Sequence, residues 1–414
     1  MINLSKEQKI LLNLLSISIS NNPESLILPS QDLESVDWTE VLKESVYQAV
    51  TLSTLSALKH YKNFVPEKVY LAWKGTGISI LKNNLNVLNN QAQLIEILDK
   101  NNVNYCIIKG SSASNYYPNP DDRTLGDIDF LIEGEKRKSI EDLLKANGYN
   151  MWDMSHPSHS VFTKGDAHVE MHFEVAGLPN NDSKEYIKKY LKPATQKIKK
   201  ETNQFGTFNA PNELYHGIII LLHMQHHMQK EGLGLRHVCD WACYLSKTYK
   251  MPFFKQELLP FLREIGLYKY AQIITEICVK YLGVAPQDWM DNKNQMICEE
   301  LMLDILSGGN FGFKDKGRSQ SAHMIAQKGE KDKGAVGNAF RAIHRIILTQ
   351  YPIVKKLWLL YPIIYGWKII KYLFLTLIGK RKSVFKLMSK ANERKDVYSK
   401  LEIFAINKEK ENNK

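Results

Sequence analysis

The sequence predicts an α+β fold in which a small mixed sheet is flanked by N-terminal and C-terminal helical regions. Residues 1–100 carry apolar side chains at helical spacing, and so does the chain from Pro211 onward. Between them, over 101–205, short apolar runs typical of strands alternate with helical segments. A chain of 414 residues with 44% hydrophobic side chains can bury a sizeable core and form two or three domains.

Shifts in composition divide the chain into six expected parts. They are an N-terminal helical region (1–100), the sheet-containing core (101–205), a helical domain (206–307), a flexible loop (308–338), an amphipathic helical segment (339–382) and a basic tail (383–414). The loop is expected because its stretch is rich in Gly, Lys and Asp and poor in large apolar residues.

A strand, a Gly-Ser turn and a helix begin the central part. Residues 105–108 form an unbroken apolar run, Lys109-Gly110-Ser111 follows, and residues 111–117 are predicted to be helical. Backbone N–H groups at such a turn point outward, and the absence of a Cβ on Gly110 lets a ligand approach the main chain. The turn is therefore a candidate phosphate site, and Lys109 could add a positive charge.

Three acidic residues lie on two further predicted strands. The period of two in a strand places Asp127 and Asp129 on one face, and Glu170 lies on a later alternating strand that pairs in a hairpin with residues 160–163. Carboxylates held close together repel each other unless a cation lies between them. An all-oxygen site of this kind suits Mg²⁺.

These motifs resemble the bacterial "uncharacterised nucleotidyltransferase" family, within the nucleotidyltransferase superfamily of the DNA polymerase β type. The shared motifs are Ile108-Lys109-Gly110, Tyr117-Pro118, Arg123, Gly126-Asp127-Ile128-Asp129 and Val169-Glu170-Met171-His172, and Met171 stands where the family has leucine. Segments at 235–241 and 308–312 are also similar, so the resemblance extends over roughly residues 40 to 370. The mixed sheet would then be a nucleotidyltransferase core.

The resemblance implies a Mg²⁺-dependent enzyme that moves a nucleoside monophosphate from an NTP to an acceptor and releases pyrophosphate. The implied catalytic and metal-binding residues, which would hold two Mg²⁺ ions, are Asp127, Asp129 and Glu170. The implied nucleotide-binding residues are Lys109, Gly110, Ser111, Arg123 and His172. A small molecule, a peptide or protein side chain and an RNA end all stay open as acceptors. The alternatives are a non-catalytic nucleotide-binding protein and a membrane-surface interaction protein that keep the fold.

A second group of polar residues follows in the helical region. His216, His223 and His227 lie along one helical stripe, and His226, His237 and Cys239 are nearby in sequence. His-x₃-His on a helix can bind Zn²⁺, but the glutamate of a metalloprotease motif is absent. We expect these residues to line the cleft, with Arg236 and Asp240 paired one helical turn apart or in contact with nucleotide.

Residues 357–378 are the most apolar segment, interrupted by Pro362, Lys368 and Lys371, and 357–382 is the stretch that could contact a membrane. The two lysines favour a helix that packs on the protein's own core or lies on an anionic membrane surface over one that spans a bilayer. The chain carries a formal charge of +11, and Lys380–Lys414 holds eleven Lys/Arg against five Asp/Glu. Such a basic tail either keeps the protein soluble or attracts anionic partners.

Five cysteines without CxxC spacing indicate reduced thiols and therefore a cytoplasmic protein. Association of this cytoplasmic protein with a membrane surface stays open. The N-terminal residues have no charged segment followed by a long apolar run, so no signal peptide is expected.

Overall fold

The computed structural model of the chain is mixed α and β. It describes residues 4–20, 23–153, 158–179, 183–291, 294–315, 317–318, 337, 340–341, 343–344, 347–348, 351, 354, 357–378 and 384–404. Short 3₁₀ turns lie at Pro23–Leu26, Ser30–Asp32, Lys59–Tyr61, Pro120–Asp122, Gly134–Lys136, Lys192–Thr195, Asn310–Gly312 and Trp358–Leu360. The α+β class predicted from the sequence is confirmed.

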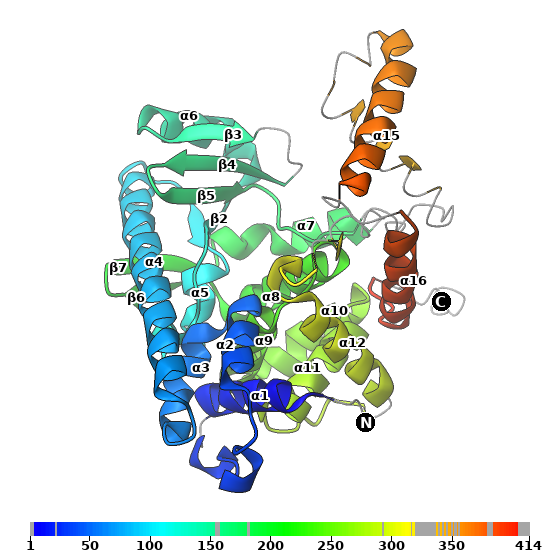
Figure 1. Cartoon of the computed structure of the whole chain (residues 1–414). Helices are drawn as coiled ribbons and strands as arrows, with labels where there is room; N and C mark the ends of the chain where they lie inside the picture. The colour runs from blue at the N-terminus through cyan, green and yellow to red at the C-terminus, as the bar shows by residue number, and fades with distance from the viewer. Residues whose placement is uncertain are drawn as a thin grey trace, which may run out of the picture.

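The N-terminal region is helical, as predicted. Its helices are α1 (Lys6–Ile19), α2 (Trp38–Tyr47), α3 (Thr51–Leu58) and the long α4 (Glu67–Lys100). Ser5 caps α1 in a capping box with Gln8, which satisfies free N–H groups of the first turn. Helix α4 runs along one side of the molecule from the helical body to the sheet, so it can support both (Figure 1).

The central sheet is small and mixed. Its strands are β1 (Tyr105–Ile107), β2 (Ile128–Ile132), β3 (Asn150–Asp153), β4 (His159–Lys164) and β5 (Ala167–His172), in the order β1-β2-β5-β4-β3. β2 and β5 are parallel, and the other neighbours are antiparallel, including the β4–β5 hairpin that the sequence predicted. Buried residues of β1, β2, β4 and β5 form one apolar cluster with the end of α4 and with α6 (Arg137–Ala146).

Beyond β5 the chain differs from its predicted boundary. After α7 (Ser183–Leu191), a two-stranded hairpin forms from β6 (Ile198–Asn203) and β7 (Gly206–Pro211). The expected boundary at residue 205 falls in the turn of this hairpin, which was not predicted. Helix α5 (Gly110–Ser114) is also shorter than expected.

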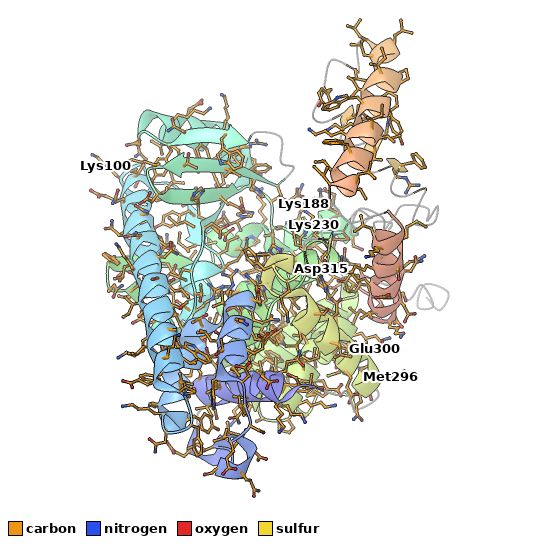
Figure 2. The ribbon with its side chains drawn as sticks, in the orientation of Figure 1. Lys100, Lys188, Lys230, Met296, Glu300 and Asp315 are labelled. Atoms are coloured by element: carbon orange, nitrogen blue, oxygen red, sulfur yellow. The ribbon has the colours of Figure 1, made fainter. Side chains whose placement is uncertain are left out.

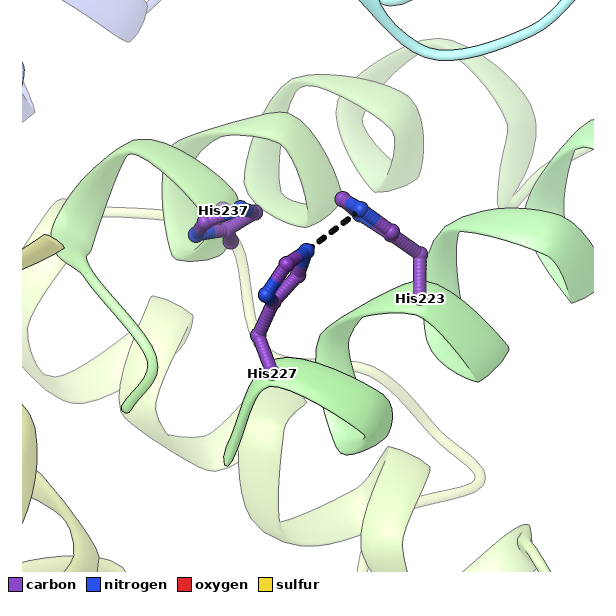
Figure 3. Close-up of side chains that lie close together, drawn as sticks. All are labelled: His223, His227 and His237. Carbon is purple, nitrogen blue, oxygen red and sulfur yellow. Dashed lines mark hydrogen bonds between the residues drawn. The ribbon is translucent and has the colours of Figure 1, made fainter. Parts of the chain in front are cut away.

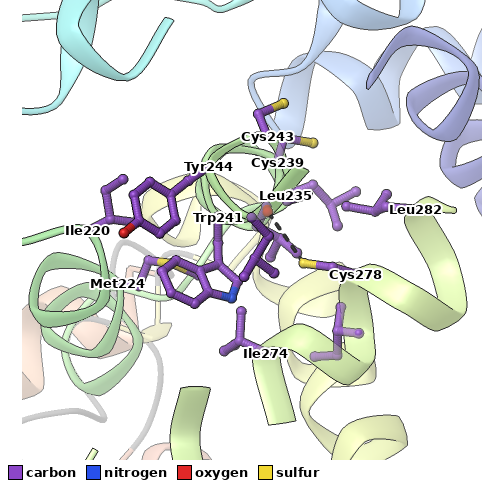
Figure 4. Packing of buried hydrophobic residues seen from close by; sticks show 14 of the residues in the cluster. Ile220, Met224, Leu235, Cys239, Trp241, Cys243, Tyr244, Ile274, Cys278 and Leu282 are labelled. Atoms are coloured by element: carbon purple, nitrogen blue, oxygen red, sulfur yellow. Dashed lines mark hydrogen bonds between the residues drawn. The ribbon is translucent and has the colours of Figure 1, made fainter. Parts of the chain in front are cut away.

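The helical body comprises α8 (Glu213–Gln229), α9 (Leu235–Thr248), α10 (Leu259–Glu264), α11 (Tyr268–Leu282) and α12 (Gln295–Gly308), with one π turn at Phe254–Leu258. Trp241 of α9 is fully buried, stacks on Tyr244 and donates its indole N–H to Thr275 of α11 at 2.9 Å (Figure 4). All five cysteines are free and buried in the same apolar cluster, and Figure 4 labels Cys239, Cys243 and Cys278. Their thiols are packing groups here.

The expected basic tail begins as an ordered helix, α16 (Val384–Lys400). Arg394, only 5% exposed, donates to the carbonyls of Met228 and Lys230 at the end of α8. Lys390 and Lys400 pair with Asp315 and Glu300, both labelled in Figure 2. Three basic side chains of the expected tail therefore make contacts inside the protein, and residues 405–414 lie outside the described residues.

Helix α15 (Tyr361–Leu377) extends away from the body (Figure 1). None of its described side chains belongs to either buried apolar cluster, so the described part does not show packing on the protein's own core, which was one of the two expected arrangements. No helix within the described ranges is long and apolar enough to cross a bilayer. Most of the predicted loop at 308–338 lies outside the described residues.

Candidate active site

The three predicted acids meet where β2 and β5 run side by side. Asp129 is directly opposite Glu170 in the parallel register, and Asp127 immediately precedes β2. Apolar side chains at Ile128 and Val169 turn into the sheet core, which leaves the acids on one face. One carboxylate oxygen from each acid lies within 4.8 Å of the others. The geometry is thus that of a site able to surround a small cation.

The acids differ in their electrostatics. Asp127 is accessible to solvent, yet the negative charge of Asp129, partial desolvation by the surrounding protein and the charge of Glu170 together raise its pKa to about 6. Burial of Asp129 alone would raise its pKa, but the Lys109 ammonium and His172 outweigh burial and hold that pKa below its usual value. Near neutral pH the site is therefore rich in negative charge, as a divalent cation requires.

Lys109 supplies the nearest positive charge. Its Nζ lies 2.6 Å from Oδ1 of Asp129, and both side chains are largely buried. The backbone at Lys109 has φ 58° and ψ −144°, a conformation that costs a non-glycine residue about 1–3 kcal/mol, and Gly110 follows at φ 36°. This conformation turns the chain from β1 into α5. A strained residue that also carries the counter-charge is typical of a functional turn.

His172 bridges two of the acids. Its Nε2 lies 2.8 Å from Oδ1 of Asp129 and 3.3 Å from Oε2 of Glu170. Burial and the Lys109 charge lower its pKa, but the two carboxylates outweigh them and raise it. His159, on the hairpin partner, lies 3.9 Å from Glu170 and its ring is 5.0 Å from that of His172. The imidazole of His172 therefore orients the acids.

Side chains of α4 hold the Gly-Ser turn and the segment before β2 in place. Ser111 is buried and donates its hydroxyl to Oε1 of Gln91 at 2.6 Å, so its side chain supports the turn. Asn84 donates to the carbonyl of Arg123 and accepts from the N–H of Leu125, which holds the segment before β2. Any contact of Ser111 with phosphate would therefore use its main-chain N–H.

Arg123 forms a buried bidentate ion pair with Asp240, a contact that was not predicted from the sequence. Its Nε and Nη2 donate to the two oxygens of Asp240 at 2.7 and 2.8 Å, and Tyr117 donates to the same carboxylate at 2.9 Å. Asp240 and Arg236 were expected to pair with each other or to contact nucleotide, but Arg236 instead reaches the carbonyl of Thr124 at 3.4 Å. Contact of Arg123 with a triphosphate stays a prediction, and it would need Arg123 to exchange Asp240 for the ligand.

Sequence reasoning missed two supporting residues, Gln91 and Asn84. Neither stands in a motif, and both act from a helix that precedes the strand by many residues. The Arg123–Asp240 pair likewise joins positions 117 residues apart. No local signal could have found these contacts.

The histidine stripe divides into two environments. His216 is fully buried against Tyr116, whose hydroxyl lies 3.1 Å from Nδ1, and burial lowers its pKa to about 3. His223 and His227 instead face His237 of α9, and all three point toward one another (Figure 3). The predicted continuous stripe is therefore a core histidine and a separate cluster.

The Gly-Ser turn and the three carboxylates on and beside β2 and β5 are the motifs on which the resemblance depends. The chain belongs to the uncharacterised nucleotidyltransferase family, whose model matches residues 34–283, well over half of the chain. This confirms the resemblance, although the match ends before the expected residue 370.

Comparison with solved structures finds the "antigenic nucleotidyltransferase-like protein from Paracoccidioides brasiliensis". It is 15% identical, with a TM-score of 0.28, over 50% of this chain and 94% of that chain. No curated protein matches the chain.

Proposed function

We propose that the protein is a Mg²⁺-dependent nucleotidyltransferase that moves a nucleoside monophosphate from an NTP to an acceptor hydroxyl and releases pyrophosphate. The observation that carries this proposal is the convergence of Asp127, Asp129 and Glu170, with carboxylate oxygens within 4.8 Å of one another. Membership of a nucleotidyltransferase family supports the same class of reaction.

The donor set fits magnesium. All three candidate ligands are carboxylates, and hard oxygen donors are the ligands that Mg²⁺ prefers. Asp127 is exposed and can reach a metal-bound nucleotide, whereas Asp129 and Glu170 are held by His172. When bound, two Mg²⁺ ions would supply the positive charge that offsets charge developing on the entering and leaving oxygens.

The chain's own groups would position the nucleotide. Lys109 neutralises Asp129 in the free protein, and its ammonium becomes available to the triphosphate once a cation has taken that carboxylate. The main chain at Gly110 and Ser111 offers N–H donors to phosphate oxygens. His172 holds two of the acids at fixed positions relative to each other, so metal ligands need little rearrangement.

Pyrophosphate release tests this proposal. The purified protein is incubated with each of the four NTPs, Mg²⁺ and a cell extract as the source of acceptor, beside an Asp127→Asn/Asp129→Asn variant. We expect release from at least one NTP that the variant abolishes, and the labelled product then identifies a small molecule, a protein or an RNA as the acceptor. NTP binding without release would replace the catalytic proposal with that of a nucleotide-binding protein.

A membrane-surface role is a second proposal, supported by α15. Its exposed side chains recur at helical spacing along one stripe: Ile363, Trp367, Ile370, Phe374 and Leu377. The helix also carries Lys368 and Lys371, and the sequence continues with further basic residues. An apolar stripe beside basic residues suits the surface of an anionic bilayer.

The five free thiols support a reducing compartment, such as the cytoplasm, as the location of the protein.

Liposome sedimentation tests the membrane role separately from catalysis. We expect binding to anionic vesicles that falls with salt, and a large loss in an Ile363→Ser/Phe374→Ser variant. A matched Leu71→Ser/Ile78→Ser variant changes exposed apolar residues of α4 and should bind as the wild type does. Equal binding by both variants would contradict the proposal.

A further inference from the structure

Three histidines come together between α8 and α9. His223 and His227 lie one turn apart on α8, and their Nε2 atoms are 2.7 Å from each other (Figure 3). His237, in the first turn of α9, places its ring 5.5 and 5.2 Å from theirs. One ring nitrogen from each histidine lies within 4.8 Å of the others. Three converging imidazoles are a common ligand set for zinc.

His237 has a buried ring whose two nitrogens are available to bind a ligand. Its side chain is only 2% exposed, and neither ring nitrogen has a hydrogen-bond partner among the described residues. A buried polar group without a partner costs free energy. Coordination of an ion would use one of these nitrogens and remove part of that cost.

Glu231 gives the cluster the outer partner that metal-binding histidines usually have. Its Oε2 lies 3.4 Å from Nδ1 of His227, so the imidazole can donate Nδ1–H to the carboxylate. Such a bond fixes the tautomer in which Nε2 carries a lone pair, and this is the nitrogen that faces His223. The ligand atom and its orientation are thus set by residues of one helix end.

The surroundings keep the three imidazoles neutral. Burial lowers the pKa of His223, His227 and His237, and the nearby Lys109 charge acts in the same direction. Phe311 covers the cluster, with its ring 4.7 Å from that of His227 and 5.5 Å from that of His237. Neutral imidazoles are the form that binds metal.

We propose that His223, His227 and His237 bind one zinc ion, with a fourth position left for water or another ligand. The ion would join α8 to α9 close enough to the catalytic turn for the Lys109 charge to reach the ligands. Around a tetrahedral ion the two Nε2 atoms would separate from 2.7 Å to roughly 3.3 Å, a small rotation of two side chains on a rigid helix. The cluster contains no carboxylate ligand, so its chemistry differs from that of the acid site.

Zinc titration of the full-length protein in excess Mg²⁺ tests this site. It is carried out in the Asp127→Asn/Asp129→Asn background, so that zinc at the carboxylates does not contribute. We expect one zinc per chain by elemental analysis and a cobalt-substituted form with the absorption of a tetrahedral site. His223→Ala and His237→Ala should each weaken zinc binding at least tenfold, whereas His168→Ala, an exposed histidine of β5, should not.

Glu231→Gln keeps the test valid if an alanine at a buried position unfolds the protein. Glu231 is partly exposed, and loss of an outer carboxylate should weaken zinc binding by roughly 10–100-fold. If the Asp127→Asn/Asp129→Asn protein bound no zinc, the proposal would be overturned. An unchanged zinc affinity in both His223→Ala and Glu231→Gln would overturn it as well. Neither result depends on whether the protein releases pyrophosphate.

Discussion

The acid site and the histidine cluster are two polar sites of opposite chemistry in one fold. The acids Asp127, Asp129 and Glu170 lie at a strand pair, carry negative charge and are balanced by Lys109. The histidines lie between two helices, burial lowers their pKa values and Phe311 covers them. The first suits a hard, exchangeable cation with a charged substrate, and the second suits a borderline metal held in place. Ligand type and local charge thus separate two metal preferences.

The largest expected effect is on turnover at the acid site. Glu170→Gln removes one negative oxygen donor without changing its shape, so pyrophosphate release should fall by at least about 10²–10³-fold. Steady-state kinetics at saturating Mg²⁺ measures this change. Asp166→Asn, in the exposed turn between β4 and β5, should keep wild-type turnover. Retained activity in Glu170→Gln would remove this residue from the site.

The next effect concerns α9, which carries both His237 and the partner of Arg123. Asp240→Asn leaves the buried guanidinium without its carboxylate, so the free energy of unfolding should fall by about 3–5 kcal/mol. Urea unfolding measures this loss. Lys138→Met, which removes an exposed ion pair with Asp142, should cost less than about 1 kcal/mol.

The Arg123→Met variant tests whether Arg123 serves the fold or contacts the nucleotide. If Arg123 is a structural partner of Asp240, both single variants should lose similar stability, and the double variant should lose less than their sum. A higher KM for NTP in Arg123→Met, with Asp240→Asn unchanged, would instead show direct contact with the triphosphate.

Lys109 is expected to matter most when magnesium is absent. Lys109→Met leaves the buried Asp129 without its cation, which should lower the free energy of unfolding by about 3 kcal/mol in EDTA. Mg²⁺ should restore part of this loss by replacing the missing charge. Unfolding curves with and without Mg²⁺ measure both values, and an equal loss in the two conditions would contradict this role.

The smallest effect is a pH dependence of Mg²⁺ affinity. Because Asp129 and Glu170 raise the pKa of Asp127 to about 6, a proton competes with Mg²⁺ below that pH. Affinity should rise roughly tenfold per unit from pH 5 to 6 and then level off. The Mg²⁺-free protein should lose stability as pH rises from about 4 through about 6, since the folded state favours protonated Asp127. Calorimetric titration at several pH values measures the affinity.

The sequence was most informative where structure is local. The period of two placed Asp127 and Asp129 together, the alternation around Glu170 predicted its hairpin, and the Gly-Ser turn followed from an apolar strand. The sequence did not predict the parallel pairing that brings Asp129 opposite Glu170, because a strand's partner depends on the whole fold.

Contacts between distant segments could not be predicted. At helical spacing the sequence offers Asp240 a permanent positive charge in Arg236, and nothing local shows that a guanidinium 117 residues away takes its place. His237 is ten residues from His227 along the chain, and only the angle between α8 and α9 brings their rings together. The same holds for α16, whose Arg394 binds carbonyls at the end of α8.

Anomalous scattering from one crystal soaked in Mn²⁺ and Zn²⁺, with Mn²⁺ as the probe for magnesium, tests both sites together. We expect a manganese peak among Asp127, Asp129 and Glu170 and a zinc peak among His223, His227 and His237. Both metals at the acids, with no peak at the histidines, would contradict the separation of the two sites. A map without manganese at the acids would contradict the proposed catalytic centre.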